Sequence, residues 1–103
     1  MKPNVAKCLL VSKVLVADGI MTENERIFLD AAMKNLGLSE EERRAVFDLE
    51  GWDEAEPVVA ALSEDEKRDF ASTLVDAASA DGRLSPLEAK AVQSILKALG
   101  VQS

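Results

Sequence analysis

The sequence predicts an all-α fold: a compact bundle of about six helices with an internal, two-fold-like repeat. Four short phrases mark helix starts, because a Ser or Thr hydroxyl and a Glu carboxylate three residues later satisfy the first backbone N–H groups of a helix in a capping box. Apolar residues recur at helical spacing behind these phrases, and no segment requires a strand. The phrases are TENE at 22–25, SEEE at 39–42, SEDE at 63–66 and SPLE at 85–88.

The first helix is the least obvious of the set. Its sequence is apolar nearly all round and rich in Val, a composition that also fits a strand. Its counterpart in the second half of the chain, RDFASTLVDAASA, settles the choice, because Phe70, Leu74 and Ala78 fall at helical intervals. In chain order we expect helices at about 4–17, 22–36, 39–49, 53–62, 63–79 and 85–99.

The second and the last helix share one pattern and one ending. In both, apolar residues recur every four positions. Gly37 and Gly100 then follow, where a left-handed residue ends a helix. The apolar positions are Phe28, Ala32 and Leu36 in one and Leu87, Ala91 and Ile95 in the other.

An internal repeat at an offset of 63 residues organises the chain. ADGIMTENE at 17–25 aligns with ADGRLSPLE at 80–88, and seven of the 22 positions from 17 to 38 are identical to their counterparts. We therefore predict a single domain over 1–103. Its halves, about 4–38 and 63–101, are similar helical hairpins joined by the middle pair of helices.

Composition narrows the partners and the compartment. The formal net charge of −7 repels nucleic acid and anionic membranes, and favours cations or a basic protein partner. Lys7 and Lys13 interrupt the first apolar stretch, which is also too short to span a bilayer, so we expect neither a signal peptide nor membrane insertion. The single Cys8 allows no internal disulfide, which suits a cytoplasmic protein.

The acidic turns contain half of a calcium-binding motif. DGRL with a later Glu matches the second half of an EF-hand loop, whose first and third positions must also supply oxygen ligands. Those positions hold Ala77 and Ser79 in one turn, and Val14 and Val16 in the other. Neither turn is therefore an EF-hand.

What remains is one Asp and one Glu in each turn: Asp18 with Glu25, and Asp81 with Glu88. For the glutamates, capping alone is one interpretation, and capping together with metal ligation is another. For the aspartates, which lie at the unfavourable negative end of a helix, one interpretation is an Asx-type turn and the other is a bound cation or a basic side chain. If the two turns meet, four carboxylates would form an oxygen-only site suited to Ca²⁺, Mg²⁺ or Mn²⁺.

The doubled pattern Asp-Gly-x-(apolar)-(Ser/Thr)-x-x-Glu, with Leu-Gly-(apolar) about twelve residues further on, resembles the TerB family. The resemblance runs from about Ala6 to Val101. It implies an all-α bundle that acts as a non-enzymatic, cytoplasmic module in bacterial tellurite resistance and stress response. It also implies a divalent cation held by the acidic residues of the turns, which on matching positions are Asp18, Glu25, Asp81 and Glu88.

Two other classes of function remain as alternatives. One is a purely structural or adaptor domain that binds a protein partner through its acidic surface and has no metal site. The other is an enzyme, which a small bundle without His or Tyr is poorly equipped to be, so we predict no enzymatic activity. Cys8 is interpreted as a buried small residue rather than a reactive thiol, and Trp52 as a plug of the bundle end rather than an exposed partner anchor.

Overall fold

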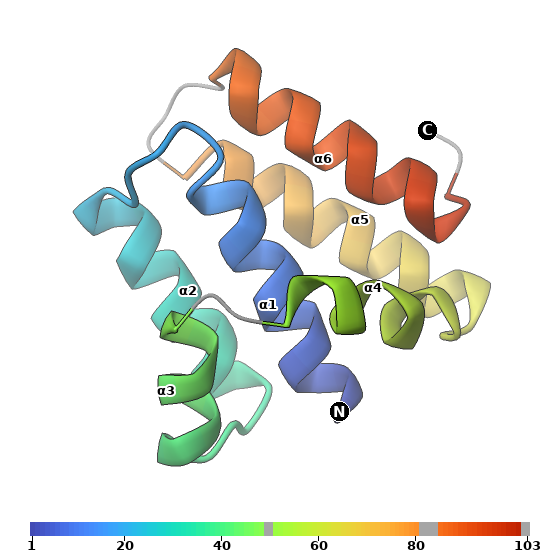
Figure 1. Ribbon diagram of the computed structural model, residues 1–103, viewed down its shortest axis with the longest axis horizontal. Coiled ribbons are helices and arrows are strands. Elements are labelled where there is room, and N and C mark those ends of the chain that lie inside the picture. Colours follow the sequence, from blue (N-terminus) through green and yellow to red (C-terminus); the bar gives the residue numbers. More distant parts are fainter. Residues whose placement is uncertain (49–50, 81–84, 102–103) are drawn as a thin grey trace.

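The computed structural model of the chain describes residues 1–48, 51–80 and 85–101 (Figure 1). It confirms the all-α prediction, and the described part of the chain contains no strand. Each expected helix is present, with its ends within about two residues of the expected position. The helices are α1 (Pro3–Leu15), α2 (Glu23–Asn35), α3 (Glu40–Phe47), α4 (Trp52–Ala60), α5 (Glu64–Ala78) and α6 (Pro86–Leu99).

Helix α1 is the centre of the bundle, and its sequence explains why. It packs against every other helix, so a single apolar stripe would not be enough, and apolar residues occupy nearly all of its faces. Figure 1 shows α1 between α2 on one side and the α5–α6 pair on the other. Its buried residues are Ala6, Cys8, Leu9, Leu10, Val11, Ser12, Val14 and Leu15.

The two hairpins bring the first residues of α2 and of α6 to the same end of the molecule. Helix α2 packs back along α1, and α6 packs back along α5. In Figure 1 the turn between α1 and α2 and the first residues of α6 lie together at the upper left of the view. The starts of α2 and α6 are therefore neighbours, although 63 residues separate them in the sequence.

The prediction of four reciprocal capping boxes is right for two of them. Thr22 and Ser39 each form the complete box with the Glu three residues later. The Ser63 and Ser85 hydroxyls accept the expected bond from a backbone N–H, but within the described residues their own backbone N–H groups donate no bond to the glutamate carboxylate. At Ser63 the side-chain hydroxyl donates to Glu66 instead.

The prediction that Cys8 is buried is confirmed, and Trp52 is packed against the core rather than fully exposed. Cys8 is fully buried in α1, and burial raises the pKa of its thiol to about 11, so the thiolate needed for reactivity is suppressed. Trp52 packs half-buried against the core, where its indole N–H donates to the Ser12 hydroxyl at 3.2 Å and Lys13 lies over its ring. In the described part of the chain, none of the helices has the length and apolar character needed to cross a membrane.

Candidate functional site

Asp18 lies in the exposed turn between α1 and α2. Gly19 follows with φ of +96°, a conformation that glycine adopts readily, and it reverses the chain toward α2. The Asp18 carboxylate accepts a hydrogen bond from the backbone N–H of Ile20 at 3.5 Å, the long limit for such a bond. The Asx-type turn is therefore formed, and in the described part of the chain it is the one hydrogen bond of this carboxylate.

Glu25 caps the start of α2 and is also buried in the interior of the protein. Its carboxylate accepts the backbone N–H of Thr22 at 2.9 Å, which completes the capping box at the start of α2. Only 1% of its surface is exposed, which is unusual for a charged side chain without a basic partner. Capping alone does not explain this burial, because Glu42 forms the same box at the surface of the molecule.

Glu88 lies at the corresponding position of α6. Its carboxyl group bonds to the Ser85 side chain, but among the described residues it does not accept a bond from the Ser85 backbone N–H. The residue is 4% exposed, and its Oε2 atom is buried without a hydrogen-bond partner among the described residues. Burial, the adjacent Glu25 carboxyl and the negative charge of Asp18 raise the pKa of Glu88 to about 7. The Glu88 side chain therefore bonds both to the Ser85 side chain at the start of its own helix and to Glu25 of the other hairpin.

A comparison with Glu42 shows why the pKa of Glu88 is raised. It has the same position in its helix as Glu88, but the backbone N–H of Ser39 holds the pKa of Glu42 below its usual value. A capping glutamate is stabilised as the anion, whereas Glu88 is stabilised as the neutral acid. The difference comes from the opposing hairpin and not from the helix itself.

The structure thus brings together three of the four predicted site residues: Asp18 and Glu25 from the first hairpin and Glu88 from the second. The fourth, Asp81, lies outside the described residues. None of the ion pairs in the described part of the chain involves these three carboxylates, so no Lys or Arg there neutralises them. Two agents reduce the charge of such a cluster: a proton on Glu88, or a bound cation.

The described side chains do not already form a metal cage. No group of three His, Cys, Asp or Glu residues within 1–48, 51–80 and 85–101 has the arrangement needed to hold a metal ion. The donor chemistry nevertheless fits a hard cation, because every candidate ligand is a carboxylate oxygen.

Comparison with known proteins identifies one family. The family model described as "Tellurite resistance protein TerB" matches residues 4–103, nearly the whole chain. No curated protein and no solved structure gives a significant match. The matched region includes both acidic turns, helices α2 to α6 and all of α1 except Pro3. The chain belongs to the TerB family.

Proposed function

We propose that this chain is a non-enzymatic, cytoplasmic module of tellurite resistance and stress response that binds a divalent cation between its two acidic turns. Membership of the TerB family supports the tellurite-resistance part of this proposal. The observation that carries the cation is the buried Oε2 of Glu88, which has no hydrogen-bond partner among the described residues and belongs to a carboxyl group in contact with Glu25 and exposed to the negative charge of Asp18. The ligands are Asp18, Glu25 and Glu88, joined by Asp81.

The preferred ions are Ca²⁺, Mg²⁺ and Mn²⁺. Carboxylate and water oxygens are the ligands that these ions favour, and neither a thiolate nor an imidazole is present among the proposed ligands. Asp18 is exposed and gives the ion access from solvent, whereas Glu25 and Glu88 hold the buried side of the site. A bound cation supplies the positive charge that no described Lys or Arg gives the cluster in an ion pair, and it links the two hairpins.

The proposal predicts that a cation stabilises the protein. At a hundred times its Kd, a ligand that binds only the folded state adds about 2.7 kcal/mol to the free energy of unfolding. For a domain of this size that raises the Tm by about 10–20 °C. The measurement uses circular dichroism to monitor thermal unfolding. It compares the Tm in chelator with the Tm in millimolar Ca²⁺, Mg²⁺, Mn²⁺ or Zn²⁺.

Two variants separate a site from general charge screening. Glu88→Gln should remove the shift, measured against the Tm of the same variant in chelator. Glu66→Gln removes one carboxylate from the same position of α5, outside the cluster, and should keep the full shift. If no cation raises the Tm, or if both variants lose the shift equally, the cation proposal fails and the adaptor function, with the acidic surface alone, takes its place.

A further inference from the structure

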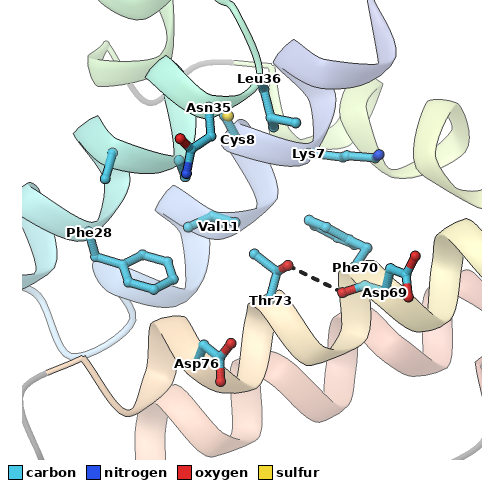
Figure 2. Close-up of a pocket in the computed structure, with 12 residues that line it drawn as sticks. Lys7, Cys8, Val11, Phe28, Asn35, Leu36, Asp69, Phe70, Thr73 and Asp76 are labelled. Carbon is cyan, nitrogen blue, oxygen red and sulfur yellow. Dashed lines mark hydrogen bonds between the residues drawn. The ribbon is translucent and has the colours of Figure 1, made fainter.

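A groove with a volume of about 400 Å³ opens between α1, α2 and α5, apart from the acidic turns (Figure 2). It exists because α2 and α5 both pack on α1 but contact each other sparsely. Short side chains, Ala31 and Ala32 on α2 and Thr73 on α5, line the space between the two helices and leave it unfilled.

The base of this groove is apolar and partly open to solvent. Phe28 and Leu36 of α2 are half-buried along one wall, and Val11 and Phe70 lie beneath them in the core. Figure 2 shows Phe28 and Phe70 directed into the space from opposite helices. Apolar surface collected in a hollow between helices is typical of a site that receives apolar side chains from a partner.

Charges on the rim of the groove indicate the kind of partner. Asp69 and Asp76 are exposed on the α5 side, seven residues apart, so they lie two helical turns or about 10.5 Å from each other. Neither carboxylate forms an ion pair with a described residue. Lys7 of α1 also lines the groove and forms no ion pair in the described part of the chain.

We propose that this groove binds one amphipathic helix of a protein partner. Its apolar face, with residues at spacings of three and four, fills the space over Phe28 and Phe70. Lys or Arg residues seven positions apart on one edge of that helix match Asp69 and Asp76, and an acidic residue on the other edge matches Lys7. This binding does not depend on a cation in the acidic turns.

A second copy of the chain is a poor occupant of the groove. Each copy has a net charge of −7, and a symmetric pair joined at this face would bring two identical acidic rims together. Such like-charge contacts disfavour association. In contrast, the negative electrostatic field of the chain attracts a basic helix, both as it approaches and after it has bound.

The test uses a synthetic, fluorescein-labelled 18-residue peptide with the proposed pattern: Leu at spacings of three and four, two Lys seven apart on one edge and one Glu on the other. Its control has the same composition in scrambled order. Binding is followed by fluorescence anisotropy, and the bound surface by ¹H–¹⁵N NMR shifts. We expect the patterned peptide to bind more tightly, with shifts concentrated in α1, α2 and α5.

Variants of the protein test separately the charges on the rim of the groove and the space inside it. Asp69→Asn with Asp76→Asn should weaken binding about fivefold, since two partly solvated ion pairs are lost. Asp53→Asn with Glu54→Gln removes the same charge from the exposed start of α4 and should change binding little. Ala31→Trp, at an exposed position, should fill the groove and abolish binding without unfolding the protein.

Several outcomes would overturn this proposal. Equal binding of the scrambled peptide, or equal weakening by the α4 variant, would reduce the interaction to general charge attraction. NMR shifts at the acidic turns in place of the groove would assign the peptide to another surface. Sedimentation that shows a dimer disrupted by Ala31→Trp would make a second copy the occupant.

Discussion

Glu88→Gln is expected to remove a decline in stability that the native protein shows between about pH 4.5 and pH 7. In the folded protein the pKa of Glu88 is raised to about 7 by burial and by the Glu25 and Asp18 carboxylates, from an ordinary value of 4.5. Between these values the unfolded chain has released the proton and the folded protein retains it. The free energy of unfolding therefore falls as pH rises, by up to about 1.4 kcal/mol per pH unit.

The variant carries no such proton, so its advantage over the native protein should grow across this window. At pH 8 in chelator we expect Glu88→Gln to be more stable by on the order of 3 kcal/mol. Urea unfolding of both proteins at half-unit pH steps measures the difference in their free energies of unfolding. A constant difference from pH 4.5 to pH 8 would contradict the raised pKa.

Glu42→Gln is the matched control, with the opposite sign. The pKa of Glu42 is held low by the Ser39 backbone N–H, so its charge adds stability above the ordinary carboxyl pKa, and that stability is lost as pH falls through the lower, folded value. Replacing Glu42 should destabilise the protein at neutral pH. Stabilisation by both substitutions would show that net charge, and not the local environment, sets the result.

Leu10→Ala is expected to destabilise the protein by about 2–5 kcal/mol, because it removes a fully buried side chain from the helix that contacts all the others. For a domain of this size each kcal/mol lowers the Tm by about 4–8 °C. The urea midpoint should fall with little change in slope. The control is Leu87→Ala at a 55% exposed position, where the change should stay within about 0.5 kcal/mol. Equal costs at both positions would contradict the central role of α1.

The helices were predictable because local chemistry determines them. Each Ser or Thr with a Glu three residues later starts a helix, and the glycines at 37 and 100 adopt the left-handed conformation expected where helices end. The apolar composition of 4–17 was ambiguous by itself, and the repeated hairpin resolved it. Its all-round apolar character is explained by the central place of α1.

The burial of Glu25 and Glu88 was not predictable from spacing. All four glutamates of the capping phrases precede a buried apolar residue by four positions, so all four lie toward the core side of their helices. Only the packing of one hairpin against the other encloses two of them and leaves Glu42 and Glu66 at the surface. The apolar residues are Leu29, Val46, Phe70 and Val92.

The groove was not predictable from the sequence, for a related reason. The spacing of Phe28, Ala32 and Leu36 correctly predicts an apolar helix face, but it does not show whether a neighbouring helix covers that face completely. The gap depends on how far α5 stands from α2 after both have packed on α1. That distance is a property of the assembled bundle.

The most direct test of the cation site is an NMR titration with Mn²⁺, whose unpaired electrons broaden the signals of nearby amides. We predict that low concentrations broaden first the amides around Asp18, Glu25 and Glu88, and that excess Mg²⁺ or Ca²⁺ reverses the effect. The acidic helix starts at Glu40–Glu42 and Glu64–Glu66 serve as internal controls for loose surface binding. Broadening that begins at those surfaces, or that spreads evenly over the molecule, would contradict a cation site at the paired turns.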